Sequence, residues 1–152
     1  MKIDIVKLHS SHLEPIANDM RPEDVKEIWL ADRSSPIGAL EICTITSDKK
    51  FALLLNGEPI MAFGIDRDGL SDHARVWLLS TPKISQVRRF FLRQSKAVFL
   101  SLTKEYTLVY NYVHEQNSVA LRWLKWLGFT IHPAIPFGAE SAQFHRVEFV
   151  RK

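Results

Sequence analysis

Residues 117–129, together with the run that precedes them, constrain the fold of this chain more than any other segment. Asn117 is a residue type that begins helices, because its side chain can accept a hydrogen bond from a free N–H of the first turn. Gly128 can take the left-handed conformation that ends a helix. Residues 107–113 before this helix and 129–131 after it are rich in β-branched and aromatic residues. The segment therefore predicts a strand, a helix and a second strand.

The composition is that of an ordinary globular protein. With 152 residues, 46% of them hydrophobic and 24% charged, the chain is long enough to form a single domain, residues 1–152, with its own core. No apolar run approaches the roughly 20 residues that span a bilayer, and the N-terminus lacks an apolar signal core, so we expect no membrane span. The single cysteine, Cys43, excludes an internal disulfide, and its apolar neighbours predict an inert, packed side chain.

Positive charge is modest and local. The net charge is +3, the isoelectric point is near 9.1, and basic residues gather mainly between positions 83 and 96. Nucleic-acid-binding proteins usually concentrate more positive charge among aromatic residues, so we expect an anionic small ligand and no nucleic acid. Arg88 and Arg89 either bind this anion or belong to a solvated helix face. The six histidines lack metal-binding spacing and no carboxylates cluster, so no metal is expected.

Periodicity along the rest of the chain predicts an α+β fold. The pair Asn-Gly at 56–57 is a strong hairpin signal and joins the predicted strands 51–55 and 59–65. Ser10 or Ser11 begins a helix that runs to residue 20, with Glu14 as the capping partner. The other predicted elements are strands at 2–8, 74–80 and 143–150, helices at 22–31, from 35 onwards and at 85–105, and a Pro-rich loop at 133–138. We expect a mixed, mostly antiparallel sheet of about six to seven strands with helices on both faces, in which strand–helix–strand units favour parallel pairing.

This order of elements resembles the GNAT fold of acyl-CoA-dependent N-acyltransferases. Asn117, Ala120, Gly128 and Phe129 carry the most specific part of the resemblance, because they match the family's pattern for this helix. Nearly the whole chain also resembles the GNAT-like proteins of tailed phages, a group that includes the internal virion protein A of podophages. The residues that carry this second resemblance include Met20, Arg21, Asp24, Glu27, Trp29, Gly57, Phe63, Trp77, Phe91, Arg93, Ser95, Tyr106, Asn111, Tyr112 and Trp123.

The resemblance implies that acetyl-CoA binds along the strand at residues 76–80, where the backbone N–H of Leu78 or Leu79 would polarise the thioester carbonyl. In the family, a glycine-rich loop binds the pyrophosphate at the start of the next helix. Residues 81–89 contain no glycine here, so this loop is degenerate. Arginine side chains can offer charge-assisted hydrogen bonds in its place. The implied cofactor contacts are Leu78, Leu79, Ser85, Arg88, Arg89 and Asn117.

The resemblance also implies where a general acid and a general base would lie. The family often has a tyrosine acid seven residues after the asparagine that opens the helix, and that position is Leu124 in this chain. The nearest titratable substitutes are His114, Tyr112 and His132. The candidates for the base are Glu27, Asp72 and Glu115. We expect His114, Tyr112 and Glu27 to be the catalytic residues.

Two hypotheses follow. In the first, the protein transfers an acetyl group from acetyl-CoA to an amine acceptor in the gap between residues 76–80 and 108–114, and His114 moves a proton. In the second, the fold is retained without catalysis, and the protein acts in phage virion assembly or binds a host or virion protein. Either hypothesis places it in the cytoplasm of the infected bacterium or in the virion. The abundance of Trp and Phe permits a homodimer.

Overall fold

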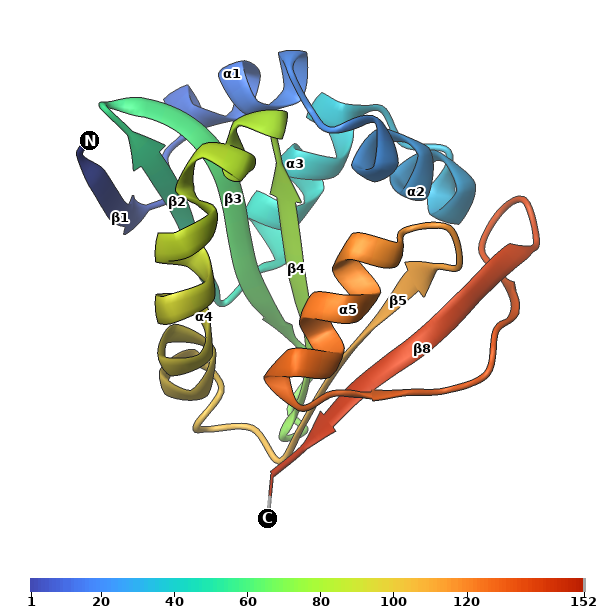
Figure 1. Ribbon diagram of the computed structural model, residues 1–152. Helices are drawn as coiled ribbons and strands as arrows, with labels where there is room; N and C mark the ends of the chain where they lie inside the picture. Colours follow the sequence, from blue (N-terminus) through green and yellow to red (C-terminus); the bar gives the residue numbers. More distant parts are fainter. Residues whose placement is uncertain (152) are drawn as a thin grey trace.

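Eight strands form one sheet in the computed structural model, which describes residues 1–151 (Figure 1). The strand order is β1-β2-β3-β4-β5-β8-β6, and β7 pairs with β8 beside this path. The strands are β1 (Ile3–Lys7), β2 (Lys49–Leu55), β3 (Glu58–Arg67), β4 (His73–Ser80), β5 (Leu108–His114), β6 (Thr130–Ile131), β7 (Ile135–Phe137) and β8 (Ala142–Val150). Within residues 1–151, only β4 and β5 pair in parallel. The predicted α+β class with a mostly antiparallel sheet is confirmed.

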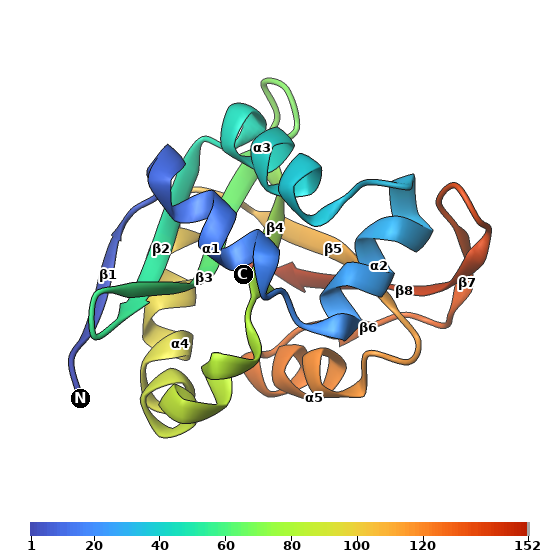
Figure 2. The ribbon, with the colours of Figure 1, turned by 90° about the horizontal axis from the view of Figure 1, so that it is seen from above.

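Helices cover both faces of this sheet, as predicted (Figure 2). The helices are η1 (Ser10–His12), α1 (Leu13–Asn18), α2 (Pro22–Asp32), α3 (Pro36–Thr46), η2 (Pro82–Val87), α4 (Arg88–Leu102) and α5 (Ser118–Leu127). On one face Ile16 of α1 and Leu40 of α3 pack on Ala62 of the sheet. On the other face Leu127 of α5 packs against Val147 of β8. The sheet therefore separates α1, α2 and α3 from α4 and α5.

Of the turn and the helix cap predicted from local sequence, the structure confirms the turn and contradicts the cap. The hairpin at 56–57 is confirmed, because Asn56 and Gly57 both have positive φ and Leu55 pairs directly with Glu58. The predicted cap at Ser10 or Ser11 is wrong. The Nδ1 atom of His9 accepts the backbone N–H of Ser11, and the His12 ring accepts the N–H of His9. These two imidazoles make the reciprocal contacts that were expected from a serine and Glu14.

Three further elements differ from the prediction. The helix expected from residue 85 begins at Arg88, because residues 82–87 form the tighter helix η2. The loop expected at 133–138 contains β7, which Ile135 and Phe137 form by pairing with β8. The strand after α5 does not pair with β5, because β8 lies between them. The expectation that strand–helix–strand units pair in parallel therefore holds, among residues 1–151, for β4 and β5 only.

The strands β4 and β5 pair over a short length and then separate. Their parallel register covers His73 to Arg75 on β4 and Leu108 to Tyr110 on β5. At the point of separation, Asn111 Nδ2 donates a 2.7 Å hydrogen bond to the carbonyl of Val76. Beyond it, the rest of β4 has a partner strand on its β3 side only. The sheet thus opens a gap at the carboxyl ends of these two strands. No helix among residues 1–151 is long and apolar enough to cross a membrane.

We predict that Gly64→Ala destabilises the protein. A Cβ at Gly64 would lie 2.4 Å from the carbonyl oxygen of Lys49 and 2.9 Å from the Trp77 ring. Backbone and a buried indole cannot both move aside, so the free energy of unfolding should fall by about 1–3 kcal/mol. Chemical denaturation measures this loss. Gly38→Ala is the control, because its new methyl group meets only the Ser35 hydroxyl. Equal stability of the two variants would contradict the prediction.

Candidate functional site

Helix α2 crosses the ends of the two separated strands and is tied to both. At β4, the N–H of Ser80 donates to Asp24 Oδ2 at 3.1 Å, and the N–H of Arg21 donates to the carbonyl of Ser80 at 2.9 Å. At the start of α5, Asn117 Nδ2 donates to Glu27 Oε2 at 2.7 Å. Asp24 and Glu27 are three residues apart and so share one helix face. This face of α2 closes one side of the gap between β4 and β5.

Glu27 is a half-buried carboxyl group that titrates near neutral pH. Burial raises the pKa of Glu27 to about 7, and the negative charge of Asp24 adds to this effect. Hydrogen bonds from Asn117 and from the backbone of His114 oppose it. Burial likewise raises the pKa of Asp24 to about 6, against the nearby guanidinium of Arg21. A carboxyl group with a pKa near 7 is suited to take up a proton from a substrate at physiological pH.

Asn117 does not cap α5 as the sequence predicted. It occupies the N-cap position, but its side chain makes no hydrogen bond to the first helical turn. The amide group donates to Glu27 instead, and Asn117 Oδ1 is buried without a hydrogen-bond partner. Only 5% of the residue is exposed. A buried, unpaired acceptor is costly, and a ligand N–H at this point would satisfy it.

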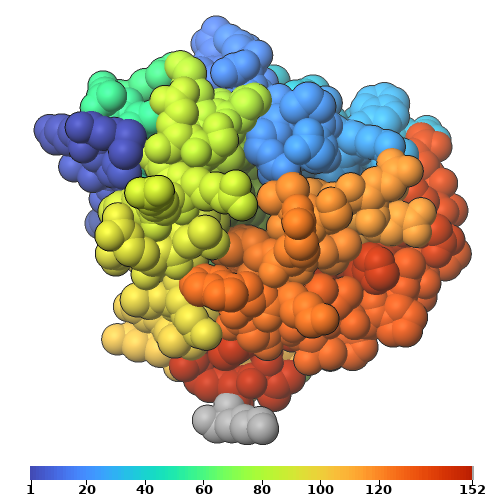
Figure 3. All heavy atoms as spheres, viewed as in Figure 1, coloured from blue at the N-terminus to red at the C-terminus, as the bar shows by residue number. Residues whose placement is uncertain are grey.

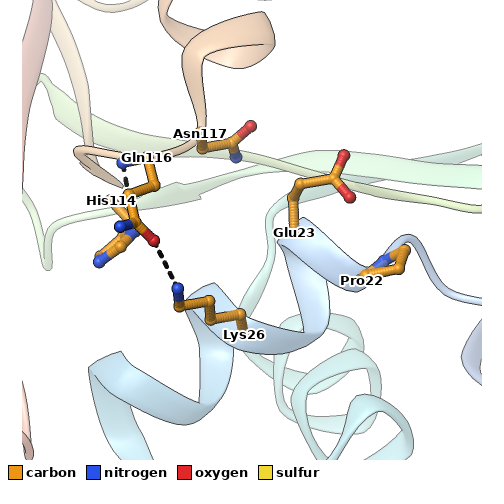
Figure 4. Close-up of a pocket in the computed structure, with 6 residues that line it drawn as sticks. All are labelled: Pro22, Glu23, Lys26, His114, Gln116 and Asn117. Atoms are coloured by element: carbon orange, nitrogen blue, oxygen red, sulfur yellow. Dashed lines mark hydrogen bonds between the residues drawn. The ribbon is translucent and has the colours of Figure 1, made fainter.

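A cavity of about 220 Å³ lies between α2 and the start of α5 (Figure 4). Its lining residues are Pro22, Glu23, Lys26, His114, Gln116 and Asn117. In Figure 4, Glu23 and Lys26 project from α2 and Asn117 from the start of α5, and Lys26 reaches across to Gln116. The cavity is therefore bordered by groups of both charges and by the buried, unpaired Oδ1 of Asn117.

His114 and Tyr112 point to the same side of β5 but have different surroundings. His114 is buried at the cavity, and burial together with the charge of Lys26 lowers its pKa, so the ring is neutral at pH 7. Its Nδ1 accepts the N–H of Gln116 at 3.3 Å, which leaves the proton on Nε2. Tyr112 stacks on Phe137 with 4.0 Å between ring centroids, and Tyr112 Oη accepts a hydrogen bond from Arg146. The structure brings His114, Glu27 and Asn117 together, whereas the Tyr112 ring lies against Phe137 and is connected to His114 only through Phe144.

The backbone groups of Leu78 and Leu79 on β4 point in opposite directions. Backbone groups alternate in direction along an antiparallel ladder. Ser80 bonds to α2 on the gap side, whereas the N–H of Thr81 bonds to Ile60 on the β3 side. The N–H and C=O of Leu78 therefore face the gap, and those of Leu79 face β3. Of the two oxyanion donors proposed from the sequence, only Leu78 is directed toward the gap.

The segment expected to bind a pyrophosphate offers side chains in place of backbone groups. Ser85, Arg88 and Arg89 line a second cavity, of about 510 Å³, beside the N-terminal residues Met1 and Ile3. Lys83 is committed to an ion pair with Glu58 at 2.7 Å. The helix η2 occupies the place of a glycine-rich loop. An anion at this point would therefore be met by the two arginines and the Ser85 hydroxyl.

A contact between α4 and α5 covers the gap from the other face of the sheet. The Phe91 and Trp123 rings lie 5.0 Å apart, and Trp123 Nε1 donates to Ser95 Oγ at 3.2 Å. Leu124, at the position of the family's tyrosine, is buried in the core beneath α5. Sequence reasoning missed the bond between Ser95 and Trp123, although a buried serine in an apolar helix face is a recognisable signal.

The remaining side chains with reactive groups, Cys43 and His132, lie outside the site. Cys43 is buried, and burial raises the pKa of its thiol, so it is inert. His132 bonds to Glu148 on β8, outside the residues that line the first cavity. Among residues 1–151, no group of three or more His, Cys, Asp or Glu side chains could hold a metal ion. The candidate site is thus Glu27, His114 and Asn117 at the separated strands.

Solved structures with a similar fold include acetyltransferases. The chain superposes on Ard1 from Thermoplasma volcanium with a TM-score of 0.74 and 16% identity, covering 100% of this chain and 99% of that one. For the spermidine N-acetyltransferase from Vibrio cholerae in complex with CoA and spermine, the TM-score is 0.69 with 12% identity over 97% and 95% of the chains. A GNAT-family acetyltransferase from Bacillus anthracis gives 0.71 with 9% identity over 99% and 95%. No protein-family model and no curated protein matches the sequence. The chain therefore has the GNAT fold.

We predict that Glu27 makes stability depend on pH. Its pKa is raised from 4.5 to about 7 in the folded protein. The folded state therefore binds this proton more tightly than the unfolded chain, and stability falls as pH rises from about 4.5 to 7. Glu27→Gln removes the titration. The difference in free energy of unfolding between the variant and the parent protein should therefore change by up to about 3 kcal/mol in favour of the variant as pH rises from 4.5 to 8.

Urea denaturation at several pH values measures the effect. Glu41→Gln on α3 is the control, because Glu41 is exposed and the same chemical change there should leave the pH dependence intact. Parallel stability curves for Glu27→Gln and the parent protein would contradict the assignment.

Proposed function

We propose that this protein is an N-acyltransferase that uses acetyl-CoA as the acyl donor and an amine as the acceptor, with Glu27 as the general base. The observation that carries the proposal is the Glu27 carboxyl group, whose pKa is about 7 where α2 crosses the separated strands. A base with this pKa takes a proton from an ammonium group at neutral pH without being permanently protonated. The GNAT fold of the chain supports the reaction class.

The residues present fit an acyl-CoA at three points. The Leu78 backbone faces the gap and can pair with an extended amide-containing arm and polarise a carbonyl. Arg88 and Arg89 have no ion-pair partner among residues 1–151 and can hold phosphate groups. The unpaired Asn117 Oδ1 can accept an amide or amine N–H. The acyl-CoA would supply the activated acyl group, and access to the gap requires Trp123 to turn away from Phe91.

Each residue of the site has a separate task. Glu27 removes a proton from the acceptor ammonium, so that the neutral amine can attack the acyl carbon. Asn117 is a positioning residue, since its amide holds Glu27 Oε2 in place. His114 is neutral and carries its proton on Nε2, so it can donate a hydrogen bond that stabilises the departing thiolate, while the proton that the attacking nitrogen loses is the one that balances the thiolate. Tyr112 is held by Arg146 and Phe137, so we assign it no proton transfer.

A second function, protein binding without catalysis, is favoured by two observations. Phe91 and Trp123 close the space between α4 and α5, and the family's tyrosine is replaced by the buried Leu124. The resemblance to GNAT-like proteins of tailed phages supports a role of this kind in virion assembly or in binding a host protein. This function needs the fold and its surfaces, and it requires no acetyl-CoA in the gap.

We expect acetyl-CoA to bind with micromolar affinity in titration calorimetry at low salt. The double variant Arg88→Ala plus Arg89→Ala should weaken this binding at least tenfold, because each arginine supplies charge-assisted hydrogen bonds to phosphate. Lys7→Ala plus Lys104→Ala removes the same charge from exposed positions that do not line this cavity and should leave binding unchanged. If no heat is detected up to millimolar acetyl-CoA, the acyltransferase proposal fails and the binding function remains.

We also expect Glu27→Gln to lower kcat/KM for acetylation of an amine acceptor by about 10²–10⁴, the usual contribution of a general base. The parent enzyme should gain activity as pH rises through about 7, because Glu27 must be ionised to accept a proton. That limb of the pH profile should vanish in the variant. Glu41→Gln is the control and should keep both rate and profile. An unaltered pH profile in Glu27→Gln would exclude Glu27 as the base.

A further inference from the structure

Helices α4 and α5 carry positive charge that nothing on these helices balances. Neither Arg88–Leu102 nor Ser118–Leu127 contains an aspartate or a glutamate. Six basic side chains lie along them, all exposed: Arg88, Arg89, Arg93, Lys96, Arg122 and Lys125. Since the whole chain has a net charge of only +3 and this set contributes +6, the remainder of the molecule carries −3. We call the outer surface of α4 and α5 the cationic face.

The charges of the cationic face are also unpaired. Eleven ion pairs join side chains among residues 1–151, and none includes any of the six. The other surface cations are often committed, as Lys49 is to Glu105 and Arg33 is to Glu140. A solvated surface normally mixes both signs of charge. Exclusion of acidic residues from two neighbouring helices indicates an anionic partner.

The two helices present one continuous surface. Lys96 Nζ of α4 lies 5.4 Å from the centre of the Trp126 ring of α5, and the Phe91 and Trp123 rings meet beneath them. Figure 3 shows this face, with α4 in yellow and α5 in orange side by side. Trp126 is 47% exposed, so an aromatic ring lies among the cations. The chain scatters these residues over about forty positions, and the fold brings them together.

We propose that the cationic face binds the phosphate backbone of a nucleic acid. Four of the six cations are arginines, whose planar forks suit phosphate oxygens. Along α4, Arg89, Arg93 and Lys96 follow one another at axial steps of about 6 and 4.5 Å, from the rise of about 1.5 Å per residue. A nucleic-acid strand repeats its phosphates on a comparable scale, about 3.4 Å per nucleotide along the axis of a duplex. A row of unpaired cations matches a polyphosphate better than the mixed charges of a protein surface.

A membrane surface fits this face less well. Helices that lie in a bilayer insert a continuous apolar side. The apolar side of α4 is already used, because Phe90, Phe91 and Phe99 pack against the sheet. What remains outside is cationic, with single apolar residues such as Leu92 between the charges. The sequence alone favoured a small anion because it placed the basic residues mainly between 83 and 96, whereas the fold adds Arg122 and Lys125 to the same surface.

Fluorescence anisotropy with a labelled thymidine 20-mer and a labelled 20-base-pair duplex tests the proposal. The protein should bind at 50 mM salt, and affinity should fall steeply as salt rises. The double variant Arg93→Gln plus Arg122→Gln removes one cation from each helix and leaves Arg88, Arg89 and the candidate active site intact. Its slope of log K against log salt should be smaller by about 1.4 for the single strand, at roughly 0.7 per lost phosphate contact. The matched control, Lys2→Gln plus Lys7→Gln, should retain the parent slope.

Three outcomes would overturn the proposal. The first is absence of binding to both oligonucleotides at 50 mM salt. The second is an equal loss in the Lys2 and Lys7 control, which would mean that net charge alone matters. The third is tighter binding to vesicles containing phosphatidylserine or to polyglutamate than to either oligonucleotide. Since the assay contains no acetyl-CoA, its result is independent of the acyltransferase proposal.

Discussion

The structure depends on how the chain satisfies the backbone of β4 after this strand leaves β5. The N–H and C=O of Ser80 are buried at the edge of the gap, and buried backbone groups without partners are costly. Helix α2 supplies both partners, the carboxylate of Asp24 and the N–H of Arg21. One turn further along, Glu27 takes the amide of Asn117. Helix α2 therefore holds the two strands apart while completing the hydrogen bonds that their separation leaves open.

This structural solution creates the chemistry of the site. A carboxyl group that accepts a hydrogen bond from a buried amide is itself removed from water. This desolvation disfavours the charged form of the carboxyl group. Asp24 and Glu27 are both in this position on one helix face, and the negative charge of Asp24 further raises the pKa of Glu27. The raised pKa of Glu27 thus follows from the architecture of the gap, without any additional catalytic device. Burial of this carboxyl group makes the fold more stable when Glu27 is protonated, and it leaves a proton acceptor with a pKa near neutral pH.

Local patterns in the sequence were sufficient for much of the fold and for little of the site. The Asn56-Gly57 turn and the helix ending at Gly128 depend on neighbouring residues, so both could be predicted. The hydrogen bond between Glu27 and Asn117 joins residues 90 positions apart, and no local pattern reveals it. Asn117 was expected to cap a helix through Oδ1, because the sequence does not show that a hydrogen bond from Nδ2 to a carboxylate orients this side chain away from the first turn of α5. The pairing of β7 with β8 and the packing of α4 against α5 also join distant residues, so the sequence did not predict them.

The two proposed activities share two residues and are otherwise separated by the sheet. Glu27 lies on α2, on the face covered by α1 and α3, whereas the cationic face lies on α4 and α5. Arg88 and Arg89 belong both to the cationic face and to the proposed contacts with the donor's phosphates. A polyanion on this face and the acyl-CoA would compete for the same two guanidinium groups. Such competition raises the apparent KM for the donor and leaves kcat unchanged, because Glu27 and its amide partner are not reached by the polyanion.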